Sequence, residues 1–258
     1  MTFPHVADKH GFITSYPAGR FLDELRRIGW EPGPLPRTVI LTYAKMELYL
    51  ATRPDLYTPN HMLGTGPGRF FMVNDSEGRV AVNCLGIGAP AAVGQIELQV
   101  ALGIERFLSI GTAGGFQLDS EPGDLVLITE AIRDEGTSYH YLPAEEPALP
   151  DPALNAGFDA ALLVAGLEVR RGVSDTTDAP HRTTAEEVAH FRAAGVLAVE
   201  MEAASIFAAT KALGVASASA VVFDGVADAD ARWHLDLGAA DVALRDLFAA
   251  TVAFAATL

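Results

Sequence analysis

The sequence predicts an α/β fold in which helices cover both faces of a central sheet, and three observations lead to it. Short runs of β-branched and apolar residues alternate along the chain with amphipathic helical stretches. The 258 residues are 50% hydrophobic, which provides enough apolar surface for a large core. No internal repeat or low-complexity segment interrupts the alternation. Strands and helices that alternate in this way indicate a largely parallel sheet.

We expect an N-terminal arm, residues 1–37, followed by one domain, residues 38–258. The arm is interrupted by Pro and Gly and contains one predicted helix, at 21–28. It is therefore not expected to form a domain of its own. The remaining length is ordinary for a single α/β domain.

The domain opens with a predicted strand at 38–43, where β-branched residues follow one another, and a short helix at 44–50. The next two strand-like runs, at 69–74 and 79–85, are separated by Asp-Ser-Glu-Gly at 75–78. Because these four residues favour turns, they predict a β-hairpin.

The rest of the domain continues the alternation of apolar strands and amphipathic helices. The predicted elements are, in order, helix 90–102, strand 106–110, glycine-rich loop 111–115, strand 124–132, proline-rich loop 133–152, helix 153–165, strand 167–173, loop 174–182, helix 184–194, strand 196–199, helix 201–213, strand 215–223 and a terminal helix from about 239. Gly214 suits the end of the helix before the last strand.

The composition excludes several classes of partner. The formal net charge is −15 and Lys and Arg do not cluster, so nucleic acids are not expected to bind. The one cysteine, Cys84, cannot form an intramolecular disulfide, which suits a reducing compartment. The N-terminal residues lack the pattern of a targeting signal, and the apolar C-terminal stretch is shorter than the ~20 residues of a membrane span. We expect a cytoplasmic protein that does not bind membranes.

Three separated segments point to one site for a ribose and a purine: SIGTAGGFQ at 109–117, VEMEAASIF at 199–207 and VFDGVAD at 222–228. In the first, glycines let backbone N–H groups approach an anion or a sugar, and Thr112 adds a hydroxyl. The segment opens no long helix, which argues against a dinucleotide-binding or Walker loop. A tight strand-to-loop turn would use the same glycines.

In the second segment, Glu200 and Glu202 lie at a strand-to-helix junction before small apolar residues. A carboxylate in a cleft can accept two hydrogen bonds from vicinal hydroxyls, which is the geometry of a ribose diol. The alternative is that these are helix-start carboxylates, favoured by the helix dipole.

In the third segment, Asp224 directly follows a buried strand, where open α/β sheets place ligand-binding groups. Burial there would favour the protonated carboxyl, which could act as a general acid. The alternative is an aspartate that caps the next turn.

Together the segments resemble the nucleoside phosphorylase and nucleosidase superfamily, in which a GT(A/C/S)GG loop, a VEMEA(A/S) motif and a final strand ending in Ser-Asp recur in this order. The resemblance runs from about residue 38 onward and includes RDEGTSYHYLP at 133–143 and TDAPHR at 177–182. It implies a three-layer α/β/α fold around a twisted mixed sheet, a small-molecule nucleoside as substrate, no cofactor, and assembly as a homodimer or a trimer of dimers.

The resemblance also implies roles for individual residues. Met201 and Glu202 contact the ribose, Glu200 supports them, and Asp224 protonates a purine leaving group at N7. Phe223 stands where the family usually has Ser, and we expect it to narrow the pocket. The other residues expected to bind substrate are Thr112, Gly88, Gly111, Ala113, Gly114, His181 and Arg182.

The nucleophile is the point on which the sequence departs from the phosphorylases. Ser109 replaces one expected arginine, and an ungapped alignment from residues 39–41 puts Glu47 at the place of another. In the related nucleosidases, a glutamate at this position activates water. A carboxylate there would repel phosphate. This favours hydrolysis without a metal, with Glu47 as general base, unless Glu47 is a surface residue of the short helix.

Two alternatives remain open. The first is phosphorolysis, with phosphate bound by Thr112, loop amides and an arginine such as Arg37, Arg53 or Arg69, from the same chain or from a neighbouring subunit. The second is a non-catalytic nucleoside-binding or storage protein, against which the presence of Glu202 and Asp224 argues.

Overall fold

The structure is a computed structural model that describes residues 4, 6, 9–33, 35–43, 45–60 and 70–258. The strands are β1 Thr38–Tyr43, β2 Tyr57–Pro59, β3 Phe70–Val73, β4 Val80–Leu85, β5 Arg106–Gly115, β6 Leu125–Asp134, β7 Val169–Thr177, β8 Ala198–Glu200, β9 Ala216–Ala227 and β10 Trp233–Leu235. The α-helices are α1 Ala18–Arg27, α2 Lys45–Ala51, α3 Ala89–Ala101, α4 Pro152–Val164, α5 Ala185–Ala193, α6 Ala203–Leu213 and α7 Leu237–Ala255.

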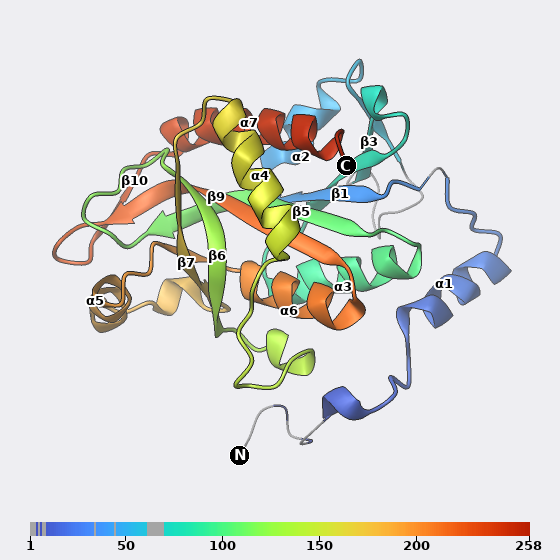
Figure 1. Cartoon of the computed structure of the whole chain (residues 1–258), viewed down its shortest axis with the longest axis horizontal. Coiled ribbons are helices and arrows are strands. Elements are labelled where there is room, and N and C mark those ends of the chain that lie inside the picture. The colour runs from blue at the N-terminus through green and yellow to red at the C-terminus, as the bar shows by residue number, and fades with distance from the viewer. Residues whose placement is uncertain (1–3, 5, 7–8, 34, 44, 61–69) are drawn as a thin grey trace.

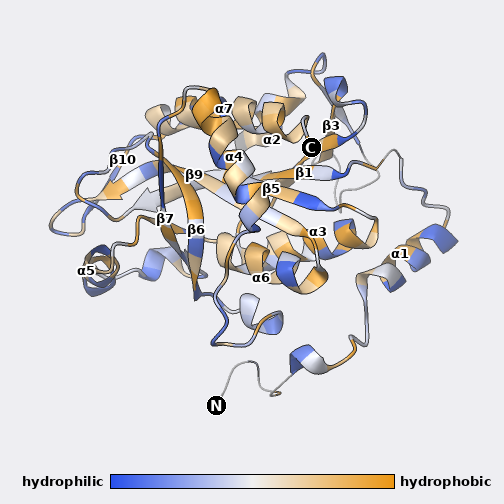
Figure 2. Cartoon of the chain, viewed as in Figure 1, coloured by the Kyte–Doolittle hydropathy of each residue, from blue (hydrophilic) through white to orange (hydrophobic). Residues whose placement is uncertain are grey.

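The strands form one central sheet between two layers of helices (Figure 1). Helices α2, α4 and α7 lie on one face, and α3 and α6 lie on the other. Neighbouring residues of the inner strands serve opposite layers: on β1, Ile40 packs toward α4 and α7, whereas Val39 and Leu41 pack toward α3 and α6. Figure 2 shows the resulting apolar interior. The predicted three-layer α/β/α fold is confirmed.

The strand order is β10-β9-β6-β7-β8-β5-β1-β4-β3-β2. Because β9 also pairs with β5, the strands β5, β9, β6, β7 and β8 close into a ring at one end of the sheet. Parallel pairs, such as β1 with β5, stand beside antiparallel pairs, such as β6 with β9. The sheet is therefore mixed, as the resemblance implied. It is less parallel than the alternation alone suggested, because closing the ring sets β6 against β9 and β8 against β5.

The predicted β-hairpin is present as β3 and β4, which pair antiparallel. Its turn contains Glu77 at φ 52° and Gly78 at φ 77°, so two successive residues adopt the left-handed conformation. Gly78 takes this conformation without the steric cost that a side chain adds. The start of the first predicted run, residue 69, lies outside the described residues.

The segment before the sheet contains the predicted helix as α1, which packs against α3. Leu22 is the buried residue of α1. Nearer the N-terminus, Lys9 Nζ donates to Nδ1 of His140 over 2.6 Å, and His10 Nε2 donates to the carbonyl oxygen of Tyr139 over 2.9 Å. The arm thus contacts the face of the domain that α3 and the 138–142 segment form.

The strands β5, β7 and β9 extend furthest beyond their predicted ends. β5 continues through Gly115, β7 through Thr177 and β9 through Ala227, so the predicted loops at 111–115 and 174–177 are strand. The physical reason is the closed ring, in which each extension finds a partner from a distant part of the chain. Glycine and polar residues that would favour a loop on their own are held in the sheet by these pairings.

Candidate functional site

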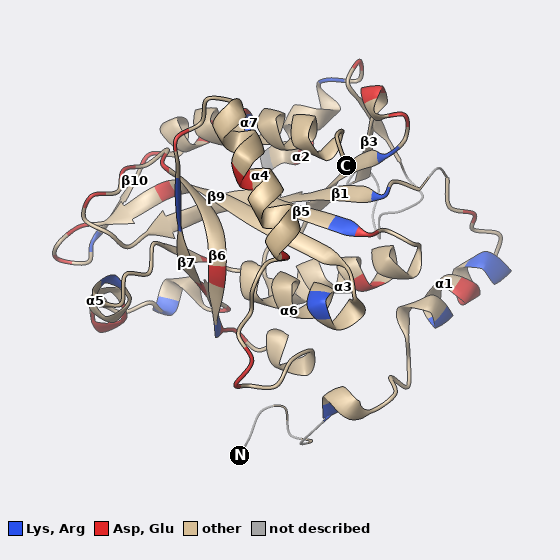
Figure 3. Ribbon diagram, viewed as in Figure 1, with Lys and Arg blue, Asp and Glu red and all other residues tan. Residues whose placement is uncertain are grey.

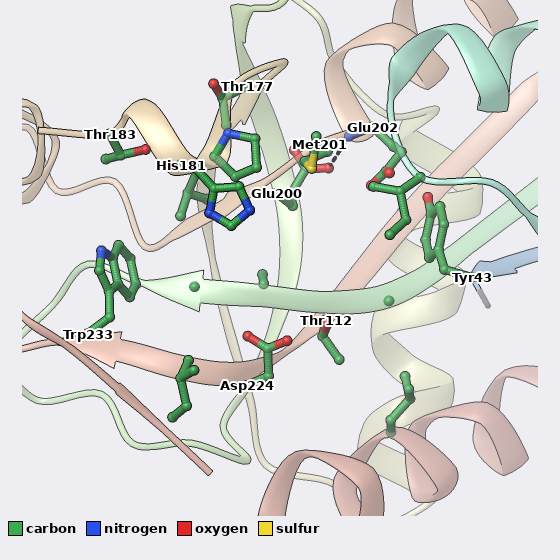
Figure 4. A pocket seen from close by; sticks show the side chains of 18 of the residues that line it. Tyr43, Thr112, Thr177, His181, Thr183, Glu200, Met201, Glu202, Asp224 and Trp233 are labelled. Atoms are coloured by element: carbon green, nitrogen blue, oxygen red, sulfur yellow. Dashed lines mark hydrogen bonds between the residues drawn. The ribbon is translucent and has the colours of Figure 1, made fainter. Parts of the chain in front are cut away.

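A cavity of about 540 Å³ opens where the ring meets the end of β1 (Figure 4). Its walls come from β1, the extended part of β5, β7, β8, β9, β10 and the segment 180–183. Most of the residues predicted from the sequence line it, namely Gly111, Thr112, Ala113, Gly114, His181, Glu200, Met201, Glu202 and Asp224. The three sequence segments therefore do meet at one place.

Gly88 is not among the lining residues, but it contacts Glu202, which lines the cavity. It precedes α3 at φ 100°, and its N–H donates to Oε1 of Glu202 over 2.6 Å. Gly88 therefore holds a cavity side chain in position. Arg182, on the short 3₁₀ turn Pro180–Arg182, is not among the lining residues.

Phe223 and Glu47 are placed differently from the expectation. Phe223 is fully buried in the core, where its ring lies against Gly115, so it does not narrow the pocket. Glu47 lies on α2 and is not among the residues lining the cavity. The reason is that Met46 and Leu50 of the same helix are buried in the layer of α4 and α7, which fixes how α2 leaves β1.

Glu200 is a structural anchor of the site. It is buried, and its carboxylate accepts hydrogen bonds from the hydroxyls of Thr176 and Ser174 and from the N–H groups of Glu202 (2.8 Å) and Ala203 (2.7 Å). Burial raises the pKa of Glu200, and these hydrogen bonds act in the opposite direction. Because two backbone donors end on this carboxylate, α6 begins at Ala203 rather than at the predicted residue 201.

Glu202 turns its carboxyl group toward the cavity at the start of α6 (Figure 4). It is only 7% exposed and is held by the N–H of Gly88 and the hydroxyl of Tyr43. Burial, reinforced by the nearby charge of Glu200, raises the pKa of Glu202 to about 8. Near neutral pH the group is therefore close to the boundary between its acid and carboxylate forms.

Tyr43, at the end of β1, was not identified from the sequence. Its hydroxyl lies 3.1 Å from Oγ of Ser109 and also bonds to Glu202. Burial and the charge of Glu202 raise its pKa well above the usual value, so the phenol keeps its proton. Thr42, beside it in the lining, has a buried hydroxyl for which the described residues provide no hydrogen-bond partner.

Asp224 lies within β9 rather than at its end. The register pairs Ala113 with Phe223 and then Gly114 with Gly225, which leaves Asp224 as the extra residue of a β-bulge. A bulge bends the strand and can re-aim a side chain. Here the carboxyl of Asp224 points into the cavity (Figure 4).

Two glycines of the run lie close to aromatic rings. A Cβ at Gly111 would lie 2.8 Å from the ring of Tyr43, and one at Gly114 would lie 2.6 Å from the ring of Trp233. The glycines therefore make room for two aromatic rings. Their backbone is part of an internal strand, paired with β9 and, at Gly114 and Gly115, also with β8. The segment is strand rather than loop, and residues 111–113 pair with β9 alone.

The lining is acidic. Glu200, Glu202 and Asp224 face it together with His181, and in the part of the chain that the structure describes no Lys or Arg lines it. Figure 3 shows basic residues on the arm, on helices, on loops and on strands. Among the described residues, no group of His, Cys, Asp and Glu side chains is placed to hold a metal ion. No helix in the described ranges is long and apolar enough to cross a membrane.

Comparisons with known proteins place these observations in a family context. A model of the phosphorylase superfamily matches residues 46–255. A guanosine phosphorylase of Halorubrum lacusprofundi is 36% identical over 146 residues, which are 54% of this chain and 58% of that protein. A uridine phosphorylase of Treponema pallidum is 34% identical over 139 residues, 50% of this chain and 54% of that protein. The chain thus spans about half the length of the curated relatives it matches.

Proposed function

Because the chain belongs to the phosphorylase superfamily, we propose that it cleaves the N-glycosidic bond of a purine nucleoside by phosphorolysis. The observation that carries the proposal is that Glu202 and Asp224, from two distant segments, face one cavity across β5. One carboxylate suits a ribose diol, and the other suits the leaving base. The names of the relatives, guanosine and uridine phosphorylase, support phosphate as the second substrate.

In the proposed reaction, a phosphate oxygen attacks C1′ of the ribose while the bond from C1′ to the base breaks. The bonding electron pair leaves with the base, and Asp224 donates a proton to N7 of the purine. Ionised Glu202 accepts hydrogen bonds from the 2′- and 3′-hydroxyls, held for that purpose by Gly88 and Tyr43. Products are the free base and ribose 1-phosphate. The reaction needs no cofactor, since phosphate is a co-substrate.

The phosphate needs a positive charge that the described lining does not provide. Arg37 is exposed and pairs with Glu105, and Arg53 lies over the ring of Tyr49, 4.9 Å from its centroid. Neither lines the cavity. Arg69 lies outside the described residues. We therefore propose that the arginine comes from that segment or from a neighbouring subunit, in a homodimer or a trimer of dimers.

Hydrolysis is the second candidate, and the acidic lining without Lys or Arg among the described residues favours it. Glu202 and Asp224 would keep the same roles, and water would replace phosphate. The position of Glu47 away from the lining gives no support to Glu47 as the base that activates this water.

One experiment separates the candidates. The protein is incubated with inosine, guanosine, adenosine and uridine, each with and without inorganic phosphate, and free base, ribose and ribose 1-phosphate are measured. We expect purine release that depends on phosphate and yields ribose 1-phosphate. Phosphate-independent release of ribose would establish hydrolysis instead. No release from any nucleoside would contradict both and leave a binding protein.

A further inference from the structure

The short strand β10 carries two apolar side chains into the cavity. Trp233 and Leu235 both line it, and His234 between them lies on the opposite side, where it bonds to Asp228. This is the alternation that a strand imposes on its side chains. The strand pairs Trp233 with Ala227 and Leu235 with Gly225.

Two glycines make room for this strand. The indole of Trp233 lies directly over Gly114, where any Cβ would overlap its ring, and the side chain of Leu235 lies over Gly225 in the same way. Both glycines belong to the inner strands of the ring. The indole can therefore approach the floor of the cavity more closely than a side chain at position 114 would allow.

The hairpin of β9 and β10 is fixed in place by polar contacts at its turn. Nε2 of His234 lies 2.8 Å from Oδ2 of Asp228, and the other oxygen of Asp228 accepts hydrogen bonds from the N–H groups of Asp230 and Arg232. Arg192 of α5 donates to the carbonyl oxygens of Ala227 and Asp228. The indole is thus presented on a positioned strand.

Trp233 and Glu202 lie on opposite sides of the proposed general acid, Asp224. Leu235 pairs with Gly225, the residue after Asp224, and the N–H of Asp236 donates to the carbonyl oxygen of Asp224 over 3.1 Å. Figure 4 shows Trp233 on one side of Asp224, and Tyr43 with Glu202 on the other. If Glu202 holds the ribose, the base extends toward the indole.

We propose that Trp233 is the stacking platform for the nucleobase and sets the preference for a purine; the orientation of the substrate rests on the proposed function. Trp233 is 36% exposed and lines the cavity, so part of its surface is left for a ligand. A flat purine offers a larger face to an indole than a pyrimidine does. Stacking between a base and an aromatic side chain is insensitive to the hydrogen-bonding pattern of the base.

The test uses the two tryptophans of the chain, Trp30 and Trp233. In the full-length Trp30→Phe variant, Trp233 is the sole indole, and its fluorescence is followed while hypoxanthine or uracil is added. The free bases have no glycosidic bond, so the measurement does not depend on turnover. Affinities of wild type, Trp233→Phe and Trp233→Ala for both bases are measured by equilibrium dialysis.

We expect hypoxanthine to quench Trp233, and Trp233→Ala to weaken hypoxanthine binding by about tenfold or more. Trp233→Phe, which keeps an aromatic ring, should lose much less, and uracil should be affected less than hypoxanthine. Unchanged hypoxanthine affinity in a folded Trp233→Ala protein, or no fluorescence change at saturation, would overturn the proposal. Quenching without any nucleoside cleavage would leave the platform standing and refute the proposed function instead, so the two failures are distinguishable.

Discussion

The two ends of the cavity differ in polarity and in exposure to solvent. At the Glu202 end, the polar groups of Glu200, Glu202 and Tyr43 are withdrawn from solvent and bonded to one another or to backbone. At the Trp233 end, an apolar ring stands on a surface hairpin whose polar contacts lie at its turn. The pKa values of the acidic groups at the two ends also differ. Burial raises the pKa of Glu202 to about 8, whereas the hydrogen bond from His234 holds the pKa of Asp228 at about 2.

The contrast indicates a division of labour under the proposed function. Ribose is common to all ribonucleosides and presents hydroxyls in a fixed arrangement, which suits a rigid hydrogen-bonded end. Bases differ in size and in their hydrogen-bond donors and acceptors. This suits an apolar ring, which binds a base through the area of contact between the two faces. Asp224, on the bulge of β9, lies between the two ends. Four predictions test this division, beginning with the largest effect.

Asp224→Asn should lower kcat for purine nucleosides by roughly 100-fold or more, because general acid catalysis contributes about that much. The matched substrate is 7-methylguanosine, whose base already carries a positive charge and leaves without a proton at N7. The variant should cleave it far better than it cleaves guanosine. Equal losses on guanosine and 7-methylguanosine would show that Asp224 does not act as the acid.

Glu202→Gln should lower kcat/KM for ribonucleosides by about 10- to 100-fold, since hydrogen bonds to a charged acceptor are the stronger kind. The loss should shrink with 2′-deoxynucleosides, which lack one of the two hydroxyls. Glu200→Gln should also lower Tm, because among the described residues the buried Glu200 carboxylate accepts hydrogen bonds from hydroxyl and backbone donors of the protein. A loss of equal size on ribo- and deoxynucleosides would argue against Glu202 as the diol acceptor.

The matched pair Gly111→Ala and Gly114→Ala compares the rigidity of the two ends directly. Each added methyl group would overlap an aromatic ring, Tyr43 in one case and Trp233 in the other. Tyr43 is tied to Ser109 and Glu202, so Gly111→Ala should destabilise the fold by about 1–3 kcal/mol, the usual cost of overpacking. Trp233 borders solvent and can shift, so Gly114→Ala should cost less stability while weakening purine binding. Denaturant unfolding measures both; a larger stability loss for Gly114→Ala would reverse the comparison.

Tyr43→Phe should produce the smallest change, seen in the pH profile. Because Glu202 must be ionised to accept the diol, kcat/KM should rise with pH through about 8. The hydroxyl of Tyr43 lowers the pKa of Glu202, so its removal should move this limb to higher pH. If kcat/KM of Tyr43→Phe rises at the same pH as in the wild type, and its plateau is measurable, Tyr43 does not influence the ionisation of Glu202.

Glu202 also allows a test based on the stability of the fold. The pKa of Glu202 is raised in the folded protein above its value of roughly 4.3 in an unfolded chain. Its contribution to stability is therefore fully present below pH ~4, and is lost as the pH rises through about 8. Glu202→Gln should flatten this part of the profile, and a nucleoside that binds the ionised form should oppose the loss.

The sequence predicted correctly that the three segments lie at one place in the fold. Each segment lies in or next to a strand that a clear run of apolar residues predicts. Residues 111–115 and 224–227 were harder, since they are strand only through pairing with distant partners. The neighbouring residues in the sequence do not distinguish a glycine that forms a loop from one that makes room for the ring of Tyr43. Glu47 shows the limit of alignment without gaps: the burial of Met46 and Leu50, not the residue count, decides where the helix after β1 points. A tryptophan nine residues after Asp224 was the available signal for the base end.

The closed ring also sets an order in which the protein can be made. β1, β4 and β5 come from residues 38–115 and can pair soon after synthesis, but the partner on the other edge of β5 is β9, which comes from residues 216–227. Until the ribosome has delivered it, β5 exposes an open edge of a kind that recruits other chains. A chain interrupted before β9 would hold much of the apolar core and none of the finished cavity. The late pairing of β9 with β5 thus makes translation through residue 227 the step that closes this edge of the sheet.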